Sequence, residues 1–287
     1  MRAARWRAGV LLAWVLALGL TGCAASVVYP RLDTLVGLYV RGLVSLDDSQ
    51  SARLARTLEH NLEWHRRDEL ERYEAFLREL AARVAGGLTR PALEDAALRA
   101  ETYWRRIFEQ AAPGYTDLAA TLTDRQVREL LQNLERADEK TWREHTQRTS
   151  EQRFRDREKS VRKHVERVTG PLDAAQRRLI SDYAWGARPF MFEWRDNRRR
   201  WREELEATLR VRTGPREAFA ARMRVLIAEP DSLWTAEYRQ ALATSRAELL
   251  DLVLQLDATL TPQQRARAQQ RLLALAEDMR DLALRRG

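Results

Sequence analysis

The chain has 287 residues, and its 50 lysines and arginines exceed its 42 aspartates and glutamates, giving a formal charge of +8. Only 12 glycines and 8 prolines are present, a composition that favours helices over turn-rich β architectures. The single cysteine excludes an intramolecular disulfide framework and any cysteine-rich zinc or iron–sulfur site. The basic balance by itself points to a nucleic-acid partner.

The first 22 residues have the three parts of an export signal. Three arginines stand among the first seven residues, and an uncharged run covers residues 8–20. This run of 13 residues is shorter than the roughly 20 that a helix needs to span a bilayer. It leads into Leu-Thr-Gly-Cys, with the only cysteine of the chain at Cys23, and this tetrapeptide resembles the lipobox of bacterial lipoproteins.

The lipobox resemblance implies that a signal peptide of residues 1–22 is removed and that Cys23 carries acyl chains such as palmitate. In that class, a residue other than Asp after the cysteine, here Ala24, implies delivery to the periplasmic face of the outer membrane. Cleavage removes three arginines and no acids, which lowers the formal charge from +8 to +5. The periplasm contains no nucleic acid, so we expect the membrane and envelope proteins as partners instead. An uncleaved membrane anchor and an ordinary secretory signal are the alternatives.

Helix periodicity dominates the rest of the chain, and no segment shows the sustained alternation of a strand. We predict an all-α fold, an elongated bundle of about eight helices. Residues 23–45 are expected to hold the lipidated cysteine, a tether and a first apolar helix. The expected helices cover residues 32–46, 47–84, 89 to a kink or end at Pro113-Gly114, 123–168, 173–211 with a disturbance at Gly186 and Pro189, and shorter stretches from Pro215, Asp231 and Thr261.

Residues 138–169 are dense in charge and have only a few scattered apolar positions. A helix with so thin an apolar stripe buries little surface. One interpretation is a solvated arm that is held by ion pairs between residues four apart. The other is an arm that binds a partner.

A Leu-Thr/Asp-x-x-Gln motif occurs four times, each time where helix periodicity begins. Its local physics is a capping box, in which the Thr or Asp side chain accepts from the backbone of the Gln and the Gln side chain accepts from the backbone of the Thr or Asp. The predicted pairs are Asp47 with Gln50, Thr123 with Gln126, Asp173 with Gln176, and Thr261 with Gln264.

The four motifs also suggest an internal duplication. The nine-residue stretches that start at Leu118 and Leu256 share six residues, so the second motif resembles the fourth, and the two Asp motifs resemble each other. We therefore interpret the chain as two related helical halves, residues 46–171 and 172–287.

Two resemblances to known families follow from these segments. Leu-Thr-x-x-Gln is similar to the signature of the Spy/CpxP-type periplasmic chaperones, which implies a concave helical cradle, although those proteins have two copies per chain. The lipobox, the first motif and the segment Trp64-His65-Arg66-Arg67-Asp68-Glu69-Leu70 together resemble a family of bacterial lipoproteins of unknown function.

No residue pattern indicates catalysis, a cofactor or a metal. His60 and His65 are five residues apart, so they lie on different faces of a helix and do not match a zinc-protease pair. We predict a protein that is not an enzyme.

Large side chains within residues 183–209 recur at spacings of seven and four, as in a coiled coil, and a row of arginines lies beside them. It is interpreted either as a core seam or as an open groove that grips apolar clients. The stripe comprises Tyr183, Phe190, Trp194, Trp201, Leu205 and Leu209, and the candidate partner-binding residues are Tyr183, Phe190, Trp194, Arg198 and Trp201.

The resulting hypothesis is a non-enzymatic binding lipoprotein of the outer membrane. Its first form is a chaperone-like holdase that covers apolar segments of envelope proteins. Its alternative form is a structural or scaffold lipoprotein that binds one specific envelope partner through residues 138–169.

Overall fold

The computed structural model describes residues 29–284, so the expected signal peptide and Cys23 lie outside the described residues. Within this range the chain forms eleven α-helices, two short 3-10 helices and one π-helical turn, and no strand. The prediction of an all-α fold is confirmed. None of the helices within residues 29–284 is both long and apolar enough to cross a bilayer.

The number of helices exceeds the expected eight, because three of the long predicted helices are divided. In chain order the elements are η1 (Tyr29–Arg31), α3 (Leu32–Leu43), α4 (Asp48–Trp64), the π turn η2 (His65–Glu69), α5 (Leu70–Gly86), α6 (Arg90–Ala120), α7 (Asp124–Thr146), α8 (Ser150–Thr169), α9 (Ala174–Gly186), α10 (Met191–Arg210), α11 (Arg216–Ala228), η3 (Pro230–Leu233), α12 (Ala236–Thr259) and α13 (Pro262–Leu284).

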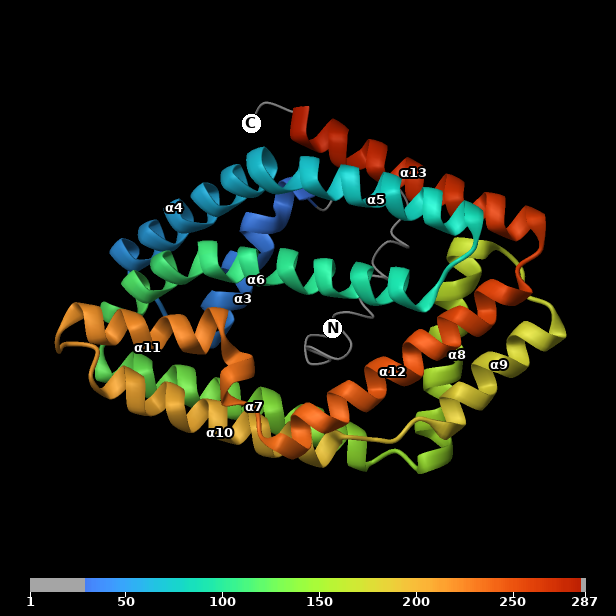
Figure 1. The fold of residues 1–287 in the computed structure, drawn as a ribbon. Coiled ribbons are helices and arrows are strands. Elements are labelled where there is room, and N and C mark those ends of the chain that lie inside the picture. Colours follow the sequence, from blue (N-terminus) through green and yellow to red (C-terminus); the bar gives the residue numbers. More distant parts are fainter. Residues whose placement is uncertain (1–28, 285–287) are drawn as a thin grey trace.

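The helices do not lie in one parallel bundle (Figure 1). The rod of α4 and α5 runs along one edge with α13 antiparallel to α5, and α7, α10 and α11 form the opposite edge. At one end of the molecule, α8 runs steeply across the direction of α5 and α13. The termini of several helices therefore meet at the corners of the molecule, where the capping motifs lie.

The prediction of a single helix over residues 123–168 is wrong, because the structure divides this range into α7 and α8. The chain leaves helical geometry after Thr146, and α8 begins at Ser150 with its own capping box, in which Thr149 and Gln152 exchange backbone and side-chain hydrogen bonds. A thin apolar stripe gives no packing reason to keep the helix straight, so a strong local N-cap sets the boundary.

The expected interruption at Pro113 is also not an end of the helix, because α6 continues through it to Ala120. Proline removes one backbone hydrogen bond inside a helix. Here the flanking turns are held by burial, since Ala112 on one side and Leu118 on the other are both less than one tenth exposed. Packing on both sides of the proline outweighs the missing hydrogen bond.

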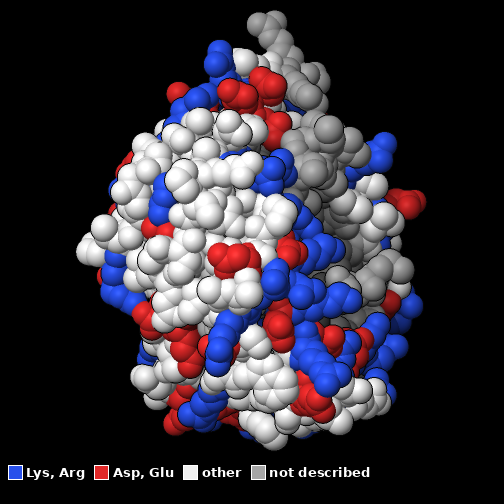
Figure 2. All heavy atoms as spheres, turned by 90° about the vertical axis from the view of Figure 1, so that its right-hand side faces the viewer, with Lys and Arg blue, Asp and Glu red and all other residues white. Residues whose placement is uncertain are grey.

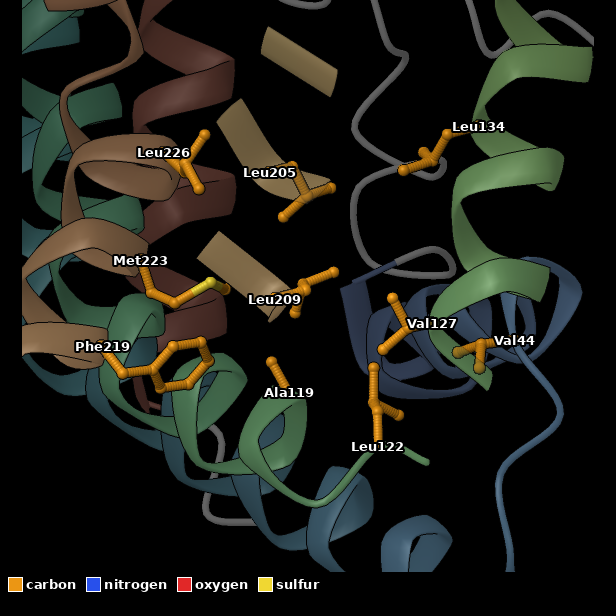
Figure 3. Close-up of a cluster of buried hydrophobic side chains, with 10 residues drawn as sticks. All are labelled: Val44, Ala119, Leu122, Val127, Leu134, Leu205, Leu209, Phe219, Met223 and Leu226. Atoms are coloured by element: carbon orange, nitrogen blue, oxygen red, sulfur yellow. The ribbon is translucent and has the colours of Figure 1, made fainter. Parts of the chain in front are cut away.

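The largest core cluster joins the two predicted halves (Figure 3). Leu122 and Val127, from the turn before α7 and its first residues, meet Leu209 of α10, and Phe219 of α11 closes the cluster from the other side. A second cluster packs α5 against α13, and so also crosses from one half to the other. The halves share their cores and are not separate globular domains.

Candidate functional site

The capping boxes predicted at the four motifs form in the structure, and they meet in pairs. At the first pair, Gln50 and Gln126 exchange side-chain hydrogen bonds, with Nε2 to Oε1 distances of 3.1 and 2.6 Å. Each amide oxygen also accepts from its own N-cap backbone, and each amide nitrogen donates to a carbonyl of the partner's loop, Thr121 or Ser45. We call this arrangement a glutamine junction.

The second glutamine junction repeats these side-chain and backbone contacts of the first. Gln176 and Gln264 exchange hydrogen bonds of 2.9 and 3.0 Å, and they donate to the carbonyls of Thr259 and Pro171. In both junctions the accepting carbonyl lies two residues before the partner's N-cap. All four amide groups are less than one tenth exposed and use their full hydrogen-bonding capacity.

The stripe of large side chains is mostly a core seam, and the open groove is not formed. Trp194, Leu205 and Leu209 are buried, and the half-buried Trp201 donates its indole N–H to the carbonyl of Leu226 at 3.0 Å. Tyr183 belongs to a different cluster, with α8 and α12. Of the proposed partner-binding residues, Phe190 alone lines the cleft between α10 and α12, so the set does not share that surface.

The arginines beside the stripe are paired with acids and do not form a free cationic rim. Arg198 and Arg202 of α10 both donate to Asp138 of α7, which is only 8% exposed, and Arg195 donates to Glu139 at 2.9 Å. The Arg198 guanidinium also lies 4.7 Å from the Trp201 ring centroid. Charges of residues 138–169 thus hold α7 to α10, instead of only pairing along one solvated arm.

Arginine and acid side chains are interspersed at the end of the molecule as well. Figure 2 shows no large area of a single sign on the face that includes α8 and α9. Exposed ion pairs such as Arg155 with Glu151, four residues apart, contribute to this mixture. The positive formal charge is therefore dispersed on this face.

Two pairs of aromatic rings flank the turn between α7 and α8. On one side, Phe192, which is 74% exposed, meets the edge of Trp142 at a centroid distance of 5.0 Å, and the Arg195 guanidinium lies 4.5 Å from the Trp142 ring. On the other side, Phe154 and Trp185 lie 5.0 Å apart, with Trp185 47% exposed. We refer to these two separate ring pairs together as the aromatic patch.

A buried polar cluster surrounds the π turn. Glu69 is fully buried, and its Oε1 accepts from Nε of Arg106 on α6 at 2.8 Å, while the Arg106 Nη2 lies 2.7 Å away. Its Oε2 has no hydrogen-bond partner among the described residues. The π turn holds one residue more than an α-helical turn, and Glu69 at its end lies against Arg106 of α6. The sequence pattern gave no sign of this.

His65 begins the same π turn and anchors the first described residue. The Tyr29 hydroxyl lies 2.9 Å from His65 Nδ1, and the imidazole contacts the edge of Tyr73 at a centroid distance of 5.4 Å. Burial lowers the pKa of His65 to about 4 and raises the pKa of Tyr29 to about 12. At neutral pH both groups are uncharged, so the pair is a neutral hydrogen bond between the start of the described chain and the rod of α4 and α5.

Two clefts on the described surface are lined by both polar and apolar side chains. The larger, of about 700 Å³, lies between α10 and α12 and is lined by Phe190, Phe192 and charged side chains of both signs. The smaller, of about 330 Å³, lies between α4 and α6 beside His60. The described residues contain no group of three or more His, Cys, Asp or Glu side chains placed to hold a metal ion.

The sequence profile of a family of unknown function, DUF6279, matches residues 42–239. This is more than half of the chain, so the chain belongs to that family. The matched region contains the first glutamine junction, the π turn and the aromatic patch. No curated protein and no solved structure matches the chain, so the expected similarity to the Spy/CpxP-type chaperones gains no support.

Proposed function

We propose that the chain is a non-enzymatic lipoprotein of the cell envelope, held at the periplasmic face of the outer membrane by acyl chains on Cys23, and that it binds one envelope protein. The scaffold form of the hypothesis is favoured over the holdase form. The attachment to the membrane is supported by the lipobox and by the position of the only cysteine.

The aromatic patch is the observation that carries this proposal. Trp142 and Phe154 both lie within residues 138–169, which the scaffold hypothesis assigns to partner binding. Exposed aromatic rings beside arginine are typical of the residues that dominate protein–protein binding energy. Such a patch suits a partner that presents apolar side chains next to acidic ones.

A holdase needs a continuous apolar surface that accepts many sequences. The stripe of residues 183–209 was the segment expected to supply it, but most of its large side chains are buried or packed against the core clusters. The larger cleft has charged walls of both signs, which suits a specific complementary partner better than varied apolar segments.

Binding is tested with a double substitution in the aromatic patch, Trp185→Ser and Phe192→Ser. Both rings are exposed, so the fold is expected to persist, which circular dichroism checks. Leu98→Ser is the matched control, since Leu98 is 56% exposed on α6. We expect crosslinking in cells to capture one stoichiometric partner with the unaltered protein and the control, and at least tenfold less with the double variant.

The same proteins in an aggregation assay separate the two forms of the hypothesis. Suppression of aggregation of several unrelated clients, undiminished by the double substitution, would favour the holdase and contradict the scaffold. The membrane attachment is tested independently with Cys23→Ser, which we expect to shift the protein from the membrane pellet to the soluble fraction.

A further inference from the structure

Helix α3 has an apolar surface that is wider than the face covered by the other described residues. Its inner face places Val36, Val40 and Leu43 against the clusters around Leu54 and Leu122. Its outer face exposes three large apolar side chains, with exposed fractions of 50% for Leu35, 58% for Leu38 and 49% for Tyr39. A surface helix of a globular protein normally turns its apolar residues toward the core.

The outer residues form one stripe and not a scatter. Leu35, Leu38 and Tyr39 have the i, i+3, i+4 spacing that aligns side chains on one face of a helix. They supply three of the eight large apolar side chains that are exposed among the described residues, and they do so from a single short helix. An exposed stripe of this kind marks a contact surface.

The chain connectivity indicates what lies against this surface. Tyr29 is fixed to the π turn through His65, and five residues, 24–28, separate it from Cys23 in the sequence. Six residue steps reach at most about 20 Å. If Cys23 is acylated, the start of α3 is therefore held close to the bilayer surface.

The composition of the outer face fits the lipid–water boundary. Tyr39 has an apolar ring and a polar hydroxyl, as side chains at membrane interfaces commonly do. Arg31 and Arg41 are exposed at the two ends of the helix, where their guanidinium groups can reach anionic headgroups. With 12 residues, α3 is suited to lie in the interface and is too short to span it.

We propose that the outer face of α3 inserts into the interfacial layer of the membrane to which Cys23 anchors the chain. This inference rests on the proposed acylation. The lipid anchor then supplies affinity, and α3 fixes the orientation of the protein on the membrane. The bilayer is favoured over a second copy of the chain because the short connection from Cys23 keeps the start of α3 near the membrane.

The test uses the mature lipidated protein in vesicles of phosphatidylethanolamine and phosphatidylglycerol. A polarity-sensitive fluorophore is attached at Leu38→Cys or, as the matched control, at Leu98→Cys, since both leucines are similarly exposed. We expect a blue-shifted emission at position 38 and several-fold stronger quenching by nitroxide lipids there than at position 98.

Two results would overturn the proposal. In the first, the label at position 38 keeps the emission of an aqueous fluorophore while the protein floats with the vesicles. In the second, its emission is blue-shifted but is not quenched by nitroxide lipids, which indicates that protein and not lipid covers the label. Failure of the anchor is distinguishable from both. In that case the protein does not float, and mass spectrometry finds Cys23 without acyl chains.

Discussion

At the residue scale, His65 is a half-buried base whose side chain has a neutral hydroxyl as its only described hydrogen-bond partner. Burial lowers its pKa from 6.5 to about 4, so the unfolded chain takes up the proton first as the pH falls. Neutral His65 therefore favours the folded state fully above about pH 6.5, and the unfolding free energy decreases as the pH falls toward 4. We expect urea unfolding to show a loss of about 2 kcal/mol between pH 7.5 and 5 from this group.

His65→Gln is the control for this pH dependence, because glutamine can still hydrogen-bond to Tyr29 but does not titrate. The variant is expected to be less stable than the unaltered protein at pH 7.5 and to lose less stability on acidification. An identical loss in both proteins would show that other groups, and not His65, determine the acid response.

The stability contribution of a capping box that is paired with a second box can be compared with that of a box that stands alone. Gln126→Ala removes the box and also leaves the buried amide of Gln50 and the carbonyl of Ser45 without their partner. Gln152→Ala removes only an exposed box. We expect losses in unfolding free energy of about 3 kcal/mol or more for the first and below about 1 kcal/mol for the second. Equal losses would mean that the junction adds nothing to the cap.

The capping boxes were predictable because each box is formed by residues within a segment of four consecutive positions. The pairing of boxes was not, since it depends on which helix starts meet in space. The leucine before each paired motif was a partial signal of this pairing. The box at Thr149 follows Arg148 and not a leucine. It is exposed, and its Gln152 pairs with no other glutamine among the described residues. The notion of two related halves fits this, as each half holds one Asp motif and one Thr motif joined in a junction.

At the element scale, the contact of α4 with α6 depends on Gly114. A Cβ built on Gly114 would lie 2.3 Å from Cγ2 and 2.8 Å from Oγ1 of Thr57. Gly114→Ala should therefore lower the unfolding free energy by about 1 to 3 kcal/mol, although alanine has the higher helix propensity. Thermal unfolding of Gly114→Ala, Thr57→Ala and the double variant measures the coupling, and the double variant should recover most of the loss.

Gly42→Ala is the matched control for this prediction, because a Cβ there meets nothing within 4 Å. It should leave the stability unchanged or raise it slightly through helix propensity. If Gly114→Ala behaves like Gly42→Ala, the close approach of the two helices is not required by the fold.

Helix ends were predictable only where the sequence marks them. Gly86-Gly87 and Gly170-Pro171 end helices as expected, and Gly87 and Gly170 have positive φ angles that glycine adopts easily. The π turn carries no such mark, because it follows from burying Glu69 against Arg106 of another helix. The continuation of α6 through Pro113 is likewise decided by tertiary packing.

At the scale of the whole molecule, the two halves depend on each other. Beyond the shared cores, Arg265 donates to the carbonyl of Val84 at 2.7 Å, and the backbone of Leu88 donates to the side chain of Asp257 at 2.9 Å. The first bond joins the start of α13 to the end of α5, and the second joins the loop after α5 to the end of α12. Separating the halves would expose apolar surface and also leave these polar groups unpaired.

We therefore expect residues 29–171 alone to show no cooperative unfolding transition and to aggregate, and residues 172–287 to behave in the same way. Coexpression of the two fragments should give a complex that copurifies and unfolds cooperatively, because the core clusters of α5 with α13 and of α7 with α10 and α11 form only when both are present. The measurement is circular dichroism during urea titration of each fragment and of the complex. A cooperative transition of residues 29–171 alone would show that the first half is an independent domain, and that the duplication joined two units already able to fold.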